Sequence, residues 1–327
     1  MVKINNNTIS EFYKSKSVLI TGGSGYIGSH IIDRLSKEDC KISCFTRNKD
    51  ILKRNGIKYI LGDYDNQDIW NEALEDVDII FHLAAQTSIY TAEKYPEMDY
   101  VANVKPIEVL LKALEIRGKV PFIVFSGSAT QFGMTESNPV SEQTEDNPSN
   151  YYDFHKLLAE RYLKLYIRKK VVKGVSLRLC NVYGPGPRSS SNDRGILNMM
   201  IKKALANETL TIYGSGNYLR DYIYIDDVVN AFILCPLNVE AVNGLHLIVG
   251  SGEGKTIKDA IIQVVNTINN AHGTVSKIEH TDPPPKLLET EFRNFIANNS
   301  LIKSKLSWNS DIGFDQGILR TAESFIK

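Results

Sequence analysis

The sequence predicts an α/β protein built around a doubly wound parallel sheet. Over the first half of the 327-residue chain, short apolar runs alternate with stretches of helical spacing. This alternation is typical of βαβ units, in which helices cover both faces of a parallel sheet. A second, smaller α/β domain is expected to follow, because the pattern changes in the second half of the chain.

Six apolar runs are expected to form strands of the sheet. Each run is short and nearly continuous in apolar residues, as strands buried on both faces are. The runs are residues 17–21, 41–45, 57–61, 77–83, 120–126 and 175–179. Helical spacing covers residues 27–35 and 157–166, so helices are expected between the strands.

We place the boundary between the two domains near residue 185. Residues 184–191 read GPGPRSSS, a composition typical of a loop. Amphipathic helices and short strands are expected beyond this loop. The first domain should therefore cover residues 1–185, with parts of 220–250 returning to it, and the second should cover residues 186–327.

Composition excludes several classes of function. Lysine plus arginine number 38, as do aspartate plus glutamate, so no excess of positive charge points to a nucleic-acid partner. The cysteines form no CxxC pair and no histidine cluster lies beside them, so no metal site is expected. Residues 1–17 are polar, unlike a signal peptide, and no apolar run reaches the roughly 18 residues of a membrane span. We expect a cytoplasmic protein with no membrane partner.

A glycine-rich segment directly follows the first predicted strand and opens the first predicted helix. Residues 22–28 read GGSGYIG. Gly22 and Gly25 would allow a tight turn and the close approach of a pyrophosphate, and Gly28 would let the helix pack on the strand. The helix N-terminus would face the anion. The segment predicts a dinucleotide site that includes Tyr26 and Ile27, although a glycine-rich turn without a ligand is the alternative.

Residues 21–30, TGGSGYIGSH, resemble the opening of the extended short-chain dehydrogenase/reductases. The resemblance is strongest to the nucleotide-sugar epimerases and dehydratases, and it extends over nearly the whole chain. It implies a Rossmann-type domain followed by a smaller α/β substrate domain. It also implies cofactor contacts from three segments, namely Asp63 with Tyr64 at the adenine, Leu83, Ala84 and Ala85 after the fourth strand, and Asn103.

Tyr152 and Lys156 form a Tyr-x-x-x-Lys pair in a predicted helix. Residues four apart share one helix face, and an ammonium beside a phenol favours the phenolate. Such a tyrosine can exchange a proton with a sugar oxygen while hydride moves to or from a nicotinamide. Tyr151 is the neighbouring alternative, but only Tyr152 lies four residues before the lysine, and the spacing alone also arises by chance.

The resemblance implies a third catalytic residue after the fifth predicted strand. By position this is Ser128, whose hydroxyl would hydrogen-bond the reacting sugar oxygen, unless the segment is only a serine-rich turn. The family's 4,6-dehydratases hold an acid and a base where this chain has Ala129 and Thr130, so that reaction is not expected. The chain also departs from the family at His155, where Ser or Thr usually precedes the lysine.

The end of the second predicted strand bears on the choice of cofactor. NAD-dependent members hold a carboxylate there, which binds the adenosine ribose. This chain has Thr46 and Arg47 instead, and both could contact the 2′-phosphate of NADP. We therefore favour NADP(H), while NAD(H) remains possible with Arg47 in solvent.

Several polar residues of the second half resemble the family's nucleotide-sugar contacts. Asn181 matches a residue that touches the diphosphate or the sugar. Arg220 opens a segment, RDYIYIDD, similar to a signature whose arginine pairs with the diphosphate, although a structural Arg–Asp pair with a neighbour is the alternative. Arg293 is a weaker second phosphate ligand, and Arg188 and Arg194 would assist.

Together these features predict an oxidoreductase acting at C4 of a nucleoside-diphosphate sugar. The strand-two end favours an NADPH-dependent 4-keto-sugar reductase. The Ser-Ala-Thr segment at residue 128 instead resembles the 4-epimerases, so an NAD-dependent 4-epimerase is the alternative. A non-catalytic cofactor-binding sensor is more remote, because it need not keep Ser128, Tyr152 and Lys156 together. The resemblance also implies a homodimer formed through two helices of each subunit.

Overall fold

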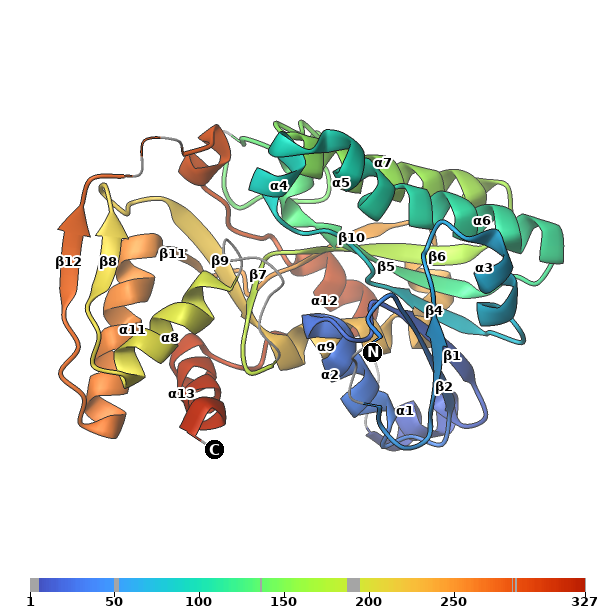
Figure 1. The fold of residues 1–327 in the computed structure, drawn as a ribbon, viewed down its shortest axis with the longest axis horizontal. Coiled ribbons are helices and arrows are strands. Elements are labelled where there is room, and N and C mark those ends of the chain that lie inside the picture. Colours follow the sequence, from blue (N-terminus) through green and yellow to red (C-terminus); the bar gives the residue numbers. More distant parts are fainter. Residues whose placement is uncertain are drawn as a thin grey trace.

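A computed structural model describes residues 6–49, 53–135, 137–186, 195–283, 285 and 287–326. The largest feature is a seven-stranded parallel sheet with the order β10-β6-β5-β4-β1-β2-β3 (Figure 1). Its strands are β1 (Ser17–Thr21), β2 (Lys41–Thr46), β3 (Ile57–Leu61), β4 (Ile79–His82), β5 (Phe122–Ser128), β6 (Lys173–Leu179) and β10 (His246–Val249). The predicted α/β class with a doubly wound sheet is confirmed.

Side chains from the strands of the sheet alternate between two cores, one on each face. In β1, Val18 and Ile20 belong to one core and Leu19 to the other, as the period of two in a strand requires. Helices α1 (Asn6–Tyr13), α2 (Tyr26–Leu35), α9 (Ile225–Leu234) and α12 (Ser300–Leu306) cover the first core. Helices α3 (Gln67–Ala73), α6 (Lys105–Arg117) and α7 (Tyr151–Arg168) cover the second. Both faces of the central strands β1 and β4 are buried, and these strands are mostly apolar.

Predicted and observed strands differ by at most two residues at either end of each strand. Strand β5 begins at Phe122 and continues to Ser128, later than the expected 120–126. Helix α1 was not predicted, because residues 1–17 read as polar. It is fixed by Tyr13, which is fully buried and donates its hydroxyl proton to the carbonyl of Ile233, 2.9 Å away.

The second part of the molecule holds two small sheets and three longer helices, at the left of Figure 1. Strands β7 (Asn181–Tyr183), β9 (Leu219–Tyr224) and β11 (Gly254–Thr256) form one sheet, and β8 (Leu210–Tyr213) pairs with β12 (Ile278–Thr281) in the other. The longer helices are α8 (Ile196–Leu205), α11 (Ile257–His272) and α13 (Phe314–Ile326). Helix α9 packs on α2, and β10 pairs with β6, so residues 225–249 lie against the main sheet. The division near residue 185 stays a prediction.

The remaining elements are short. They are α4 (Ile89–Lys94), α5 (Pro96–Asn103), α10 (Val239–Val242), and the 3-10 turns η1 (Ala129–Phe132), η2 (Pro236–Asn238) and η3 (Glu289–Phe292). Helices α4 and α5 lie against the N-terminal half of α7 at the top of Figure 1. Among the described residues, no helix is both long and apolar enough to cross a membrane.

Candidate active site

The glycine turn between β1 and α2 leaves no room for a side chain at Gly22 or Gly28. Gly22 has φ +67°, and a Cβ there would lie 2.8 Å from the backbone nitrogen of Ala84. A Cβ on Gly28 would collide with the backbone of Gly22 and Gly23. At the N-cap of α2, Gly25 offers no capping side chain, and the first turn of the helix carries no acidic residue. An anion at this end of α2 would therefore meet backbone N–H groups and no opposing charge.

Thr21 joins the glycine turn to the loop after β4. Its Oγ1 accepts hydrogen bonds from the backbone N–H groups of Leu83 and Ala84, both at 3.1 Å. The same oxygen lies 3.1 Å from Nδ1 of His82, whose pKa burial and the charge of Lys156 lower to about 3. Strands β1 and β4 are parallel neighbours, so both loops lie at one edge of the sheet. Ligands of open α/β sheets bind at this edge, where the strand order reverses.

Tyr64 is buried in contact with the glycine turn. Its hydroxyl accepts the N–H of Gly22 at 3.1 Å and donates to the carbonyl of Phe45 at 3.1 Å. The ring packs against Phe45 and Trp70, and burial raises the pKa of the phenol to about 12. Neighbouring Asp63 is exposed, so of this predicted pair only Asp63 presents its side chain to solvent.

At the end of β2, the two residues predicted to determine whether NAD or NADP binds have different surroundings. Thr46 is buried, and its Oγ1 contacts Oγ of Ser24 at 3.0 Å and accepts the N–H of Asn48 at 3.1 Å. Arg47 is exposed, with its guanidinium 5.6 Å from the centre of the Tyr64 ring. Thr46 therefore stabilises the glycine turn, and Arg47 leaves its charge at the surface.

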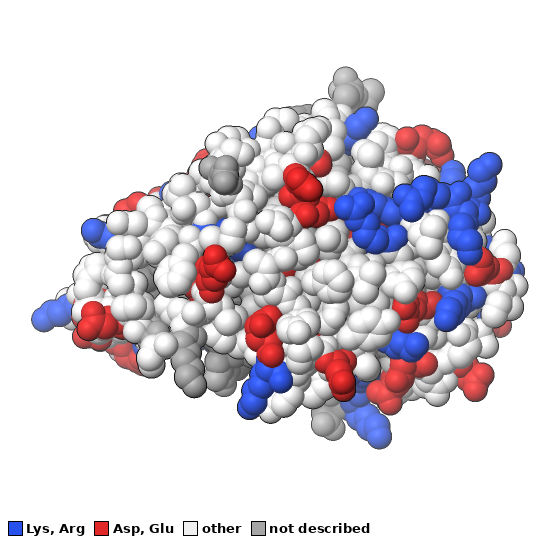
Figure 2. Space-filling model, turned by 90° about the horizontal axis from the view of Figure 1, so that it is seen from above, with Lys and Arg blue, Asp and Glu red and all other residues white. Residues whose placement is uncertain are grey.

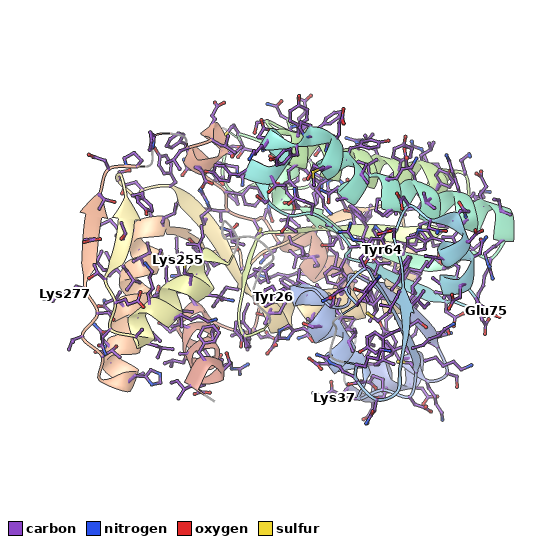
Figure 3. The ribbon with its side chains drawn as sticks, viewed as in Figure 1. Tyr26, Lys37, Tyr64, Glu75, Lys255 and Lys277 are labelled. Atoms are coloured by element: carbon purple, nitrogen blue, oxygen red, sulfur yellow. The ribbon has the colours of Figure 1, made fainter. Side chains whose placement is uncertain are left out.

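Tyr26, predicted to be a cofactor residue, ties α2 to the loop after β7. Its hydroxyl donates to the carbonyl of Gly184 at 3.0 Å, which Asn198 of α8 also contacts. One turn later, His30 donates from Nε2 to the carbonyl of Pro185 at 2.8 Å. Figure 3 shows Tyr26 where the two parts of the molecule meet. The tyrosine thus positions the loop that leads from one part of the fold to the other.

Ser128 stands at the carboxyl end of β5 and caps η1. Its Oγ lies 2.8 Å from Oγ1 of Thr130, and its backbone N–H donates to Oε1 of Gln131 at 2.8 Å. Helix α7 packs on both β5 and η1. The hydroxyl is therefore held at the same edge of the sheet as the glycine turn.

Helix α7 buries both members of the Tyr-x-x-x-Lys pair. Tyr152 is 6% exposed and Lys156 4%, whereas Tyr151 is 47% exposed, as expected if Tyr152 is the tyrosine of the site. The N-cap of the helix is Asn150, whose side chain accepts the N–H of Asp153 at 2.9 Å. The ammonium of Lys156 lies 4.5 Å from the centre of the Phe125 ring in β5. Burial lowers the pKa of Lys156 to about 8, against the opposing effect of the Asp99 and Glu160 charges.

The two arginines predicted to bind phosphate lie next to each other. Arg220 of β9 is 8% exposed and donates to the carbonyls of Leu219 at 3.0 Å, Glu291 at 2.8 Å and Arg293. Arg293 is buried, with Nη1 4.0 Å from a carboxylate oxygen of Asp153 in α7. Arg220 thus contacts backbone carbonyls rather than forming the Arg–Asp pair weighed above, and these contacts hold residues 291–293 near helix α7. Asn181 is exposed at the start of β7, and Arg188 and Arg194 lie outside the described residues.

Residues 18–250 match the model of the NAD dependent epimerase/dehydratase family. The chain belongs to this family. The match spans the main sheet from β1 through β10, together with the glycine turn, Ser128, Tyr152 and Lys156. The family resemblance expected from residues 21–30 is confirmed.

Similar proteins include several named nucleotide-sugar enzymes. A putative UDP-glucose 4-epimerase of Methanocaldococcus jannaschii is 28% identical, over 93% of this chain and 96% of the relative. A dTDP-4-dehydro-6-deoxyglucose reductase of Escherichia coli is 26% identical, over 95% of this chain and 98% of the relative. Among solved structures, a UDP-N-acetylglucosamine 4-epimerase from Methanobrevibacter ruminantium, in complex with UDP-N-acetylmuramic acid, is 26% identical. Its TM-score is 0.85, over 96% of this chain and 99% of that one.

Two buried carboxylates whose charges act on Lys156 were not predicted from the sequence. Asp99 is wholly buried and bonded to Asn103, which was singled out as a cofactor residue. Glu160 is wholly buried one turn after Lys156. Each lies four residues from a predicted site residue on the same helix, and that spacing was the available signal.

Proposed function

We propose that this protein is an NAD(P)-dependent oxidoreductase acting at C4 of a nucleoside-diphosphate sugar, most simply as a 4-epimerase. The observation that supports this best is the burial of Tyr152 and Lys156 on the helix that packs against Ser128, at the same sheet edge as the glycine turn. The names of the relatives from Methanocaldococcus jannaschii and Methanobrevibacter ruminantium support the same reaction.

Each residue of the site has a defined part in this proposal. The glycine turn, Tyr152 and Lys156 would hold a nicotinamide cofactor, which would supply the hydride chemistry at the sugar carbon. Tyr152 as phenolate takes the proton of the C4 hydroxyl and gives it back when the carbonyl is reduced on its other face. Lys156 favours the phenolate through its positive charge, and the Ser128 hydroxyl donates a hydrogen bond to the sugar oxygen.

The test compares two neighbouring tyrosines. Tyr152→Phe should lower turnover of UDP-glucose to its C4 epimer by about 10²–10⁴-fold, because the acid–base group is lost. Tyr151→Phe, which changes an exposed ring, should keep full turnover. Equal turnover by Tyr152→Phe and the wild type would remove the mechanism.

A 4-keto-sugar reductase is a second candidate, and the end of β2 favours it. No carboxylate stands at residues 46–48, and Arg47 is exposed there, as a 2′-phosphate site requires. The reductase of Escherichia coli is a relative that supports this reaction. Stoichiometric loss of free NADPH with a 4-keto sugar would establish a reductase, whereas reduction of protein-bound cofactor on adding a nucleotide sugar would establish an epimerase.

For the reductase candidate, we propose that Arg47 gives a preference for NADP(H) over NAD(H). Arg47→Ala should weaken NADP⁺ binding by about 10–100-fold, the worth of one hydrogen-bonded charge pair, and leave NAD⁺ binding unchanged. Lys58→Ala, at another exposed cation, is the control and should change neither. Tighter binding of NAD⁺ than NADP⁺ by the wild type would contradict the preference.

For the substrate, we propose that Arg293 and Asn181 contact the diphosphate while Arg220 holds residues 291–293 beside them. Arg293→Ala should raise KM for the nucleotide sugar with a smaller effect on kcat, since the diphosphate does not react. An unchanged KM would show that the diphosphate does not bind at Arg293.

A homodimer is proposed from the face formed by α5 and α7. These helices pack together and expose large apolar side chains, namely those of Met98, Val101, Phe154 and Leu165. Figure 2, which views the molecule from above, shows a largely uncharged area near the centre, with acidic side chains around it and basic side chains gathered toward the right. Light scattering should give twice the 36.7 kDa of one chain, and Phe154→Glu should shift the mass to one chain.

A further inference from the structure

One short segment of the second part of the molecule reaches the catalytic helix. We call residues 288–293 the strap. Figure 1 shows its turn η3, in orange-red, between the small sheets at the left and α4. Arg220 of β9 holds the strap through its backbone, donating to the carbonyls of Glu291, at 2.8 Å, and of Arg293. The strap is therefore fixed to the second part of the molecule by hydrogen bonds to its main chain.

The strap also contacts the helices around Tyr152. Leu288 packs against the buried cluster that Tyr152 forms with two side chains of α4. The hydroxyl of Tyr90, in α4, donates to Oε1 of Glu291 at 3.3 Å. The ring of the proposed acid–base residue thus belongs to a small apolar cluster that the strap helps to cover.

A charged contact joins the strap to the first turn of α7. Nη1 of Arg293 lies 4.0 Å from Oδ2 of Asp153, and the two side chains are 9% and 0% exposed. The same carboxylate oxygen accepts from Nδ2 of Asn150 at 2.6 Å, which fixes it to the start of the helix. Water screens neither charge, so removal of one leaves the other buried without this partner. Asp153 directly follows Tyr152, so the contact lies beside the candidate acid–base residue.

We propose that Asp153 and Arg293 form an ionic tie that holds the strap against α7 and keeps Leu288 over Tyr152. Asp153 is thereby a positioning residue for Tyr152. The proposal rests on the function proposed for Tyr152, and it deepens that function by assigning the cover of the tyrosine to the second part of the molecule.

The tie is compatible with the diphosphate contact proposed for Arg293. A guanidinium carries five N–H donors, so one carboxylate partner leaves donors for a phosphate oxygen. One side chain would then contact the diphosphate and hold the strap over Tyr152. Asp153, by contrast, has no assigned contact with the substrate, so its substitution tests the positioning role by itself.

The test measures the exposure of the Tyr152 ring by ¹⁹F NMR of protein labelled with 3-fluorotyrosine. The shift of a fluorine signal between H₂O and D₂O grows with the exposure of its ring to solvent. Tyr152→Phe and Tyr151→Phe assign the two signals by their absence. Tyr152, 6% exposed, should show a small solvent shift and Tyr151, 47% exposed, a large one. This readout needs neither cofactor nor sugar, so failure of this proposal is distinguishable from failure of the proposed activity.

Breaking the tie should expose Tyr152. In Asp153→Asn, which retains an acceptor for Asn150, the solvent shift of Tyr152 should rise about twofold or more, because the buried guanidinium loses its counter-charge and draws the strap away. Arg293→Met should raise it similarly while leaving the Asn150 contacts in place, and it tests the same tie if Asp153→Asn does not fold. The double variant should show no larger shift than either single variant.

Two further variants separate the tie from general loosening of the helix. Leu288→Ala removes the cover but not the charges, and it should also raise the solvent shift of Tyr152. Arg161→Met removes an exposed arginine from the middle of α7 and should leave the shift unchanged. An unchanged Tyr152 shift in folded Asp153→Asn and Arg293→Met, an additive rise in the double variant, or an equal rise in Arg161→Met would overturn the proposal.

Kinetics give a second readout if the proposed activity is found. Asp153→Asn should lower kcat by about 10-fold or more with little change in KM, because a misplaced acid–base group slows the chemical step without weakening substrate binding. Arg293→Ala should instead raise KM, as proposed above. A rise in KM with unchanged kcat in Asp153→Asn would overturn the positioning role.

Discussion

Two buried carboxylates close to Lys156 have opposite electrostatic surroundings. Glu160 accepts from Arg178 at 2.8 and 3.0 Å, Lys164 at 2.7 Å, Ser176 at 2.7 Å and Gln131 at 3.1 Å. These contacts, Arg178 first among them, more than offset burial and hold the pKa of Glu160 well below its usual range. Asp99 instead accepts from two amides and a histidine. Among the described residues, Glu160 is therefore saturated with cationic partners, whereas Asp99 has no lysine or arginine within ion-pair distance.

The Glu160 network also determines where Ser128 stands. Gln131 donates to Glu160 and accepts the backbone N–H of Ser128, so the end of β5 is tied to α7. Ser176 and Arg178 extend the same network to β6. The serine and the Tyr–Lys pair are therefore positioned by one buried ionic cluster.

The largest expected effect on stability comes from breaking that cluster. Glu160→Gln should lower the free energy of unfolding by about 3–5 kcal/mol, because the Arg178 side chain remains buried with one partner fewer. Urea denaturation measures the change. A loss below 1 kcal/mol would contradict the assignment of Glu160 to the scaffold.

The buried Lys156 predicts a dependence of stability on pH. Burial lowers its pKa to about 8 from the usual 10.5, so between these values the unfolded chain holds this proton more tightly than the folded one. The contribution of Lys156 to the free energy of unfolding should therefore rise with pH in that window, by up to about 3 kcal/mol. Urea denaturation of the wild type and of Lys156→Met from pH 7 to above 10 measures this contribution as the difference between their free energies of unfolding. If the advantage of the wild type falls as the pH rises, the predicted direction is wrong.

A smaller loss of stability is expected from Asp99→Asn. The amide retains an acceptor for Gln86 or Asn103, and no buried arginine or lysine loses a direct partner, so the cost should be about 1–2 kcal/mol. Urea denaturation of Asp99→Asn and of Glu160→Gln ranks the two losses of unfolding free energy. If Asp99→Asn cost more than Glu160→Gln, the distinction between the two carboxylates would fail.

The smallest effect is expected at an exposed ion pair. Glu115 and Lys169 lie 2.7 Å apart on the surface, with side chains 43% and 48% exposed. Glu115→Gln should change the free energy of unfolding by less than about 1 kcal/mol, since water screens both charges. A larger loss would show that removing a carboxylate lowers the free energy of unfolding whether or not the carboxylate is buried, so burial would not explain the effect expected at Glu160.

Much of the fold could be predicted because its signals are local. Strand β1 lies in the middle of the sheet and is buried on both faces, so its nearly continuous apolar run predicted its observed ends. Helix α1 was missed, because its stability depends on burying Tyr13 against α9 rather than on its own polar sequence. The side-chain contacts of Tyr64, Tyr26 and Arg220 were also beyond sequence analysis, since their partners lie 42, 158 and 71–73 residues away.

The sequence by itself determined the doubly wound sheet, the glycine turn and the face shared by Tyr152 and Lys156. Each of these follows from steric and periodic rules that act within a few residues. Only the tertiary structure decided which charges surround Lys156. Asp99 lies 56 residues before His155, and folding brought the two together by packing α5 on α7. A buried charge is governed by its nearest neighbours in space, and packing rather than chain order selects them.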